Sequence, residues 1–114
     1  MPPIAVIDFE TTGISPGQGA RATEVAIVLL ERGQVVDRFQ SLMKTGAWIP
    51  PFITQLTGIT NAMVSAAPEA VGVMRDAARF VGDAPMVAHN AAFDSKFWQA
   101  ELARAGLAAP QPFA

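Results

Sequence analysis

Residues 4–13 read IAVIDFETTG, an apolar run that meets two acidic residues, Asp8 and Glu10, near its end. A short continuous apolar run of this kind predicts a buried strand, Ile4 to Phe9, with the acids at its C-terminal tip. Because side chains two positions apart in a strand point to the same face, both carboxylates would project together. Unpaired like charges raise each other's pKa, and a divalent cation such as Mg²⁺ removes that penalty. A pair of solvated acids at a strand end is the simpler alternative.

Three small residues, Thr11, Thr12 and Gly13, follow the acids directly. Their hydroxyl groups and the flexible glycine backbone would let a substrate approach closely beside the carboxylates. This neighbourhood favours a functional site over two solvated acids.

Two further strands are expected immediately after this segment. A turn at residues 15–19 leads to a strand at residues 24–31, and Gly33-Gln34 makes a tight reversal into a strand at residues 35–43. With the first strand, these would form an antiparallel meander.

The second half of the chain shows a broken helical pattern and then one more strand. We expect a short helical turn at 52–56, interrupted at residues 57–61, and a helix that begins at Pro68 and continues to about Gly82. A fourth strand at 85–89 and a last helix at 91–105 follow; Asn90 can cap that helix and Gly106 ends it. A strand, a crossover helix and a strand make the first and fourth strands parallel neighbours. The predicted fold class is therefore α/β with a mixed sheet.

A third acid, Asp94, lies in the first turn of the expected last helix. Because the C-terminal ends of parallel neighbours meet where α/β folds usually bind ligands, Asp94 would converge on Asp8 and Glu10. The alternative is an acid that the helix dipole merely favours. His89, at the end of the fourth strand, is interpreted as a structural histidine with satisfied hydrogen bonds.

Composition limits the class of protein. The 114 residues suit one domain, half of them are hydrophobic, and the absence of cysteine excludes disulfides and thiolate sites. The mean hydropathy of +0.30 hints at a face that a missing segment covers. No apolar run could span a bilayer and no signal peptide fits before the first strand, so we expect a cytoplasmic protein without membrane association.

The net charge of −2 argues against a duplex-binding module that relies on a basic face. It is compatible with nucleic acid held by metal ions and a few stacking contacts.

Three segments resemble the DnaQ-like (DEDD) 3′–5′ exonucleases, the group of the epsilon proofreading subunit of bacterial DNA polymerase III. Residues 8–13 resemble the first motif, residues 89–94 (HNAAFD) the second, and residues 56–60 (LTGIT) with Met63, Ala67 and Pro68 the connecting segment. The resemblance covers the chain from Ile4 to about Gly106. An unrelated α/β domain with chance matches would need several coincidences.

This resemblance implies a ribonuclease H-like fold and a two-metal phosphodiesterase that uses Mg²⁺ or Mn²⁺. In such a reaction two ions about 4 Å apart clamp the scissile phosphate. Asp8 would bridge both ions, while Glu10 and Asp94 would each hold one. The implied substrate is the 3′ end of single-stranded DNA or RNA, and the implied partner is a DNA polymerase catalytic subunit.

The resemblance also implies contacts to the substrate. Thr11, Thr12 and Gly13 would border the terminal nucleotide. The Thr57-Gly58-Ile59 turn and Phe93 would flank a base, although core packing is an equal alternative for Phe93. The expected substrate-contacting residues are Thr11, Thr12, Gly13, Thr57, Gly58, Ile59, Asn90 and Phe93.

The family's third motif, a histidine general base and an aspartate five residues apart on a final helix, has no match after Asp94. We therefore interpret residues 1–114 as a single exonuclease domain truncated after the second motif, with its C-terminal part missing. The chain would then be an incomplete and inactive enzyme, or a catalytically inactive module that binds a nucleic-acid end or a polymerase. The fourth strand would have an unpaired outer edge, through which the chain would self-associate.

Overall fold

The computed structural model describes residues 3–108 and residue 113. Its elements follow in the order β1 (Ile4–Thr11), the 3-10 helix η1 (Pro16–Gln18), β2 (Ala22–Glu31), β3 (Gln34–Leu42), α1 (Pro51–Thr57), α2 (Asn61–Ser65), α3 (Ala70–Val81), β4 (Met86–Val87) and α4 (Ala91–Arg104).

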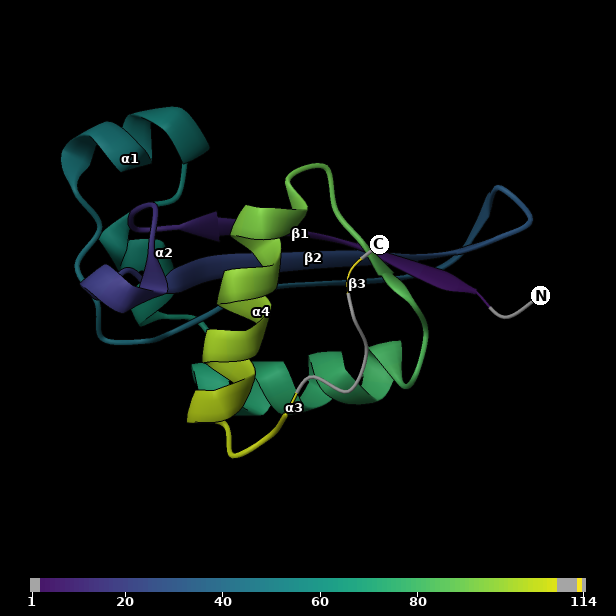
Figure 1. Cartoon of the computed structure of the whole chain (residues 1–114). Coiled ribbons are helices and arrows are strands. Elements are labelled where there is room, and N and C mark those ends of the chain that lie inside the picture. Colours follow the sequence, from purple (N-terminus) through teal and green to yellow (C-terminus); the bar gives the residue numbers. More distant parts are fainter. Residues whose placement is uncertain (1–2, 109–112, 114) are drawn as a thin grey trace.

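One mixed sheet organises the chain, with strand order β3-β2-β1-β4. β1 pairs antiparallel with β2 and parallel with β4, and β2 pairs antiparallel with β3. The α/β class, the meander and the parallel fourth strand are confirmed. Figure 1 shows α4 crossing the sheet, α3 running along it, and the short helices α1 and α2 gathered at one end.

The main core lies between one face of the sheet and helices α3 and α4. Alternate residues of β1 are buried there, namely Ala5, Ile7 and Phe9, as a half-buried strand requires. The helices contribute Val73, Met74, Ala77, Phe97, Trp98 and Leu102 to the same cluster. The alternation leaves Asp8 and Glu10 on the opposite face of β1.

A second, smaller cluster lies on that opposite face. Ile49, Ile59 and Val64 are buried together, with Leu42 and Ile53 packed against them. Leu42 is the register partner of Glu24, which is in turn the partner of Glu10. Directly opposed residues of neighbouring strands share a face, so this cluster attaches α1 and α2 to the face that carries Glu10.

The strand and turn boundaries differ slightly from those expected. The β2–β3 reversal is centred on Arg32 and Gly33, both with positive φ (54° and 79°), one residue earlier than predicted. This backbone matches a two-residue hairpin, which requires positive φ at both central positions. β4 is shorter than predicted and contains only Met86 and Val87.

The helices differ from the sequence-based expectations in three respects. The helix expected from Pro68 begins at Ala70 with Glu69 as its N-cap, because the carbonyl of Pro68 accepts a hydrogen bond from the Lys44 amide (2.8 Å). The helix α2 was not predicted at all. Asn90 is the N-cap of α4 but makes no side-chain capping hydrogen bond.

The outer edge of β4 is not fully open, which corrects another expectation. Met86 forms a parallel bridge with Phe113 in addition to its pairing with Ala5. From the sequence we also expect Pro110 and Pro112 to end the chain without further structure, and both lie outside the described residues. Within the described part of the chain, no helix is long and apolar enough to cross a membrane.

Candidate active site

The three predicted acids come from two elements, β1 and α4, which are joined by a hydrogen bond from a backbone amide to a carboxylate. Asp8 is exposed and Glu10 is half-buried on β1, whereas Asp94 on α4 is 3% exposed. The amide of Phe9 donates to Oδ1 of Asp94 (3.1 Å). β4 pairs with β1 only at Ala5 and Val6. Beyond these residues, the first turn of α4 lies beside Phe9, where a longer β4 would otherwise pair with β1.

The environment of the acids changes how two of them ionise. Burial raises the pKa of Glu10, and the charges of Asp8, Glu24 and Asp94 raise it further. Burial likewise raises the pKa of Asp94; the Phe9 amide opposes this shift, Asp8 adds to it, and His89 opposes it. Burial is thus the largest cause of the raised pKa at Glu10 and Asp94, and the neighbouring carboxylates add to it.

Glu24 is an additional acid that sequence reasoning missed. It is the direct partner of Glu10 across β1 and β2, and its carboxylate accepts a hydrogen bond from Gln40 Nε2 (3.0 Å). The sequence predicted both strands that carry these glutamates. It did not predict the register that places Glu10 opposite Glu24.

As the side chains stand, no group of three or more histidine, aspartate or glutamate residues in the described ranges is close enough together to hold a metal ion. The donor set nevertheless fits a hard divalent cation, because it consists of carboxylate oxygens. A cation would also relieve the mutual repulsion that raises the pKa of Glu10.

The turn after β1 is held by hydrogen bonds of its own hydroxyl groups. Thr11 Oγ1 donates to the Gly13 carbonyl (2.6 Å), and Thr12 Oγ1 accepts from the Arg21 amide (3.1 Å). The Thr12 amide also donates to the Arg21 carbonyl (2.9 Å). A Cβ at Gly13 would stand 3.3 Å from the Cβ of Ala20, a close contact that glycine avoids.

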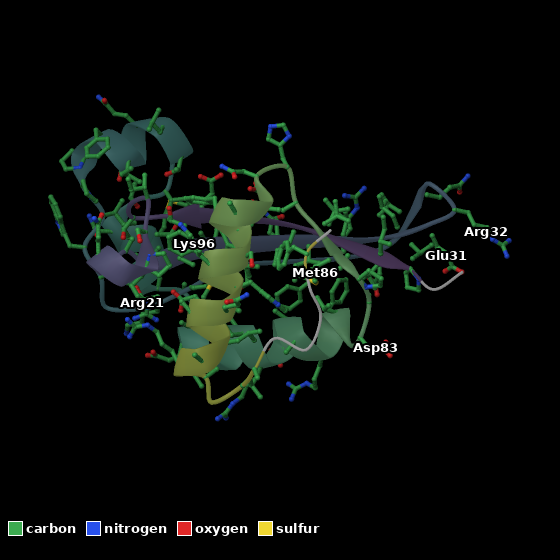
Figure 2. All side chains as sticks on the ribbon, viewed as in Figure 1. Arg21, Glu31, Arg32, Asp83, Met86 and Lys96 are labelled. Atoms are coloured by element: carbon green, nitrogen blue, oxygen red, sulfur yellow. The ribbon has the colours of Figure 1, made fainter. Side chains whose placement is uncertain are left out.

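A buried ion pair fixes this turn to α4. The Arg21 guanidinium donates two hydrogen bonds to Glu101 (both 2.9 Å), and the Ala22 amide donates a third (3.0 Å). Glu101 is 2% exposed. Figure 2 shows Arg21 beside α4, the helix that also carries Asp94. Sequence reasoning missed this pair, because nothing local connects positions 80 residues apart.

The connecting turn forms the end of α1. Thr57 Oγ1 donates to the Ile53 carbonyl (2.9 Å) and accepts from the Ile59 amide (3.1 Å), while Gly58 adopts φ 77° at the C-cap. The side chain of Ile59 is 4% exposed in the second cluster. The side chain of Ile59 therefore packs inside the protein, and the role of the Thr57-Gly58-Ile59 turn in flanking a base stays a prediction.

The second motif divides between exposed and packed residues. Asn90 and His89 are exposed, and the interpretation of His89 as a structural histidine with satisfied hydrogen bonds stays a prediction. Phe93 is half-buried and its ring lies 4.9 Å from that of Phe97, an arrangement that favours the core-packing alternative.

Comparison with known proteins gives a consistent result. A family model described as exonuclease (RNase T) matches residues 5–113. The 3′-5′ exonuclease DinG of Bacillus subtilis is 41% identical over 105 residues, which is 92% of this chain and 11% of that protein. The PolC-type DNA polymerase III of Halalkalibacterium halodurans is 37% identical over 102 residues, which is 90% of this chain and 7% of that protein.

Among solved structures, the nuclease domain of 3′hExo, a DEDDh family member bound to rAMP, superimposes with a TM-score of 0.78 and 26% identity. The match covers 98% of this chain and 63% of that domain. The chain thus spans about a tenth or less of the two curated relatives and under two thirds of this structural neighbour.

Proposed function

Because the chain belongs to the DnaQ-like (DEDD) exonuclease family, we propose that its complete form removes nucleotides from the 3′ end of single-stranded nucleic acid. The observation that carries this proposal is the link between β1 and α4, where the Phe9 amide holds Asp94 beside the strand of Asp8 and Glu10. Two distant motifs thereby supply three carboxylates to one end of the sheet.

Asp8, Glu10 and Asp94 would hold two divalent cations, Mg²⁺ or Mn²⁺. Such a pair supplies an activated water and stabilises the leaving 3′ oxygen. Only Oδ1 of Asp94 is engaged by the Phe9 amide, so Oδ2 is available as a ligand. The ion pair of Arg21 with Glu101 keeps the Thr11-Thr12-Gly13 turn in place, where its backbone would border the terminal nucleotide.

A general base is expected from the third motif, which no residue after Asp94 matches. We propose that residues 1–114 are the first part of an exonuclease domain and are inactive alone. A longer chain with a final helix carrying histidine and aspartate would complete the site. The identity with a PolC-type polymerase supports a DNA polymerase as partner, and so a proofreading role.

A calorimetric Mn²⁺ titration tests the metal site in the 114-residue chain. Wild type should bind, whereas Asp8→Ala should bind at least tenfold more weakly. Asp83→Ala is a matched control, because this exposed aspartate lies before β4, at the opposite end of the sheet (Figure 2). Equal binding by wild type and Asp8→Ala would refute the metal assignment.

The alternative function is a catalytically inactive module that binds a nucleic-acid end or a polymerase, and the missing third motif favours it. Incubation of the longer chain with a 5′-labelled oligonucleotide and Mg²⁺ or Mn²⁺ separates the two. Stepwise shortening from the 3′ end supports the enzyme, and binding without shortening supports the module.

A further inference from the structure

A cavity of about 260 Å³ lies between the segment after β3 and α2. Its lining includes Lys44, Thr45, Trp48, Asn61 and Ser65, which together offer an ammonium group, hydroxyl groups and an indole ring. None of these residues belongs to the two matched family motifs, to the connecting segment or to the acidic site.

Trp48 is exposed although its backbone is firmly held. The side chain is 66% exposed, whereas the next residue, Ile49, is 1% exposed in the second cluster. Asn61 accepts from the Ile49 amide (2.8 Å) and donates to the Ile49 carbonyl (3.1 Å). An indole ring that stands at the surface beside an anchored residue and lines a cavity with polar groups is an arrangement suited to stacking on a base.

The sheet register places this cavity near the acids. Glu10, Glu24 and Leu42 are successive partners across β1, β2 and β3, and they share one face of the sheet. With strands roughly 4.8 Å apart, Leu42 lies about 10 Å from Glu10. Lys44 follows two residues later, and Leu42 itself packs on the cluster that contains Ile49.

We propose that this cavity binds an upstream nucleotide of the single strand whose 3′ end lies at the acids, with its base stacked on Trp48. This inference rests on the proposed function. The Lys44 ammonium and the hydroxyl of Ser65 would face the phosphate. Among the described residues, the Lys44 ammonium pairs only with the exposed Glu69, at 3.9 Å. Such surface pairs contribute little, so the ammonium can turn to a phosphate.

This lining favours nucleic acid over a protein partner, because it combines a stacking ring with donors for phosphate. It also explains how a chain of net charge −2 would retain a polyanion, since a stacked base contributes affinity that needs no basic face.

Tryptophan fluorescence provides a direct test, since Trp98 is 1% exposed and Trp48 is the accessible ring. Oligothymidylate of about twelve nucleotides, a length within the usual range for single-strand sites, is titrated into the 114-residue chain with Ca²⁺. We expect quenching of the Trp48 emission in wild type. Fluorescence anisotropy of a labelled oligonucleotide should show Trp48→Ala binding roughly 5- to 100-fold more weakly, the effect of losing one stacked base. Trp48→Phe should retain most of the affinity.

Phe52→Ala serves as the matched control, because Phe52 is an equally exposed aromatic residue (61%) that does not line the cavity. No quenching, unchanged affinity in Trp48→Ala, or an equal loss in Phe52→Ala would each overturn the proposal. A protein-docking surface would give the first of these results. Shortening of a 5′-labelled oligonucleotide by the longer chain is measured in a separate experiment. If affinity depends on Trp48 but no hydrolysis occurs, the proposed function is refuted and this inference stands.

Discussion

Glu10 destabilises the fold in the absence of a cation, because burial and the neighbouring charges raise its pKa. Its pKa in the folded chain exceeds the ordinary 4.5, so the folded state binds the proton more tightly than the unfolded state. The resulting loss of stability is complete above the raised pKa and disappears below pH 4.5.

We therefore predict that Glu10→Gln raises the melting temperature at pH 7 in EDTA, and that this gain vanishes at about pH 4, below the unfolded pKa. Thermal unfolding followed by circular dichroism at both pH values measures the effect. Glu31→Gln, at the hairpin tip far from the site (Figure 2), should show no comparable gain. A lower melting temperature for Glu10→Gln at pH 7 would contradict the electrostatic account.

His89 gives a second prediction at the residue scale, revised by its exposure. Exposed substitutions usually change stability by less than about 0.5 kcal/mol, so His89→Gln should leave the free energy of unfolding nearly unchanged. Urea denaturation of the 114-residue chain measures this value. In the longer chain, a rate loss of about 10²–10⁴-fold in fully folded His89→Gln would instead identify His89 as a general base.

Two elements that are distant in sequence, the start of β2 and α4, are joined by the pair of Arg21 with Glu101. Removing one partner of a buried pair leaves an uncompensated charge and costs about 3–5 kcal/mol. We expect Arg21→Ala to lower the unfolding free energy by an amount in this range, since Glu101, which is 2% exposed in the intact chain, would lose its bidentate partner. Chemical denaturation provides the measurement.

The matched control for that variant is Arg79→Ala, because Arg79 pairs with Asp76 on the exposed surface of α3. An exposed pair three residues apart on a helix contributes about 0.5 kcal/mol or less. Equal losses in Arg21→Ala and Arg79→Ala would show that the Arg21 pair does not anchor the turn to α4.

At the scale of the whole molecule, the edge of β4 decides how the chain behaves in solution. Phe113 forms a bridge with Met86 and packs against the main core, so it covers part of an otherwise apolar edge. Removing residues 109–114 should therefore increase self-association, because exposed apolar strand edges pair with other chains. Light scattering at matched concentrations should give a larger mass for the shortened chain. If the full chain and the shortened chain are both monomeric, the edge of β4 does not mediate self-association.

The sequence by itself determined the class of fold and the family. The continuous apolar run at residues 4–9 predicted the buried strand β1, the helical spacing of apolar residues predicted the helix that ends near Gly82, and two motifs with the segment between them indicated the exonuclease family. These are local signals, since each depends on residues within one turn or one strand of each other. The roles of Asp8, Glu10 and Asp94 as metal ligands stay predictions.

Only the tertiary structure decided how those segments meet. The bond from Phe9 to Asp94, the pair of Arg21 with Glu101, and the bridge of Met86 with Phe113 each join positions that no local pattern relates. Register also placed Glu24 opposite Glu10, and the second cluster on the same face. The physical reason is that pairing and packing energies depend on the whole fold, whereas helix and strand preferences act over a few residues.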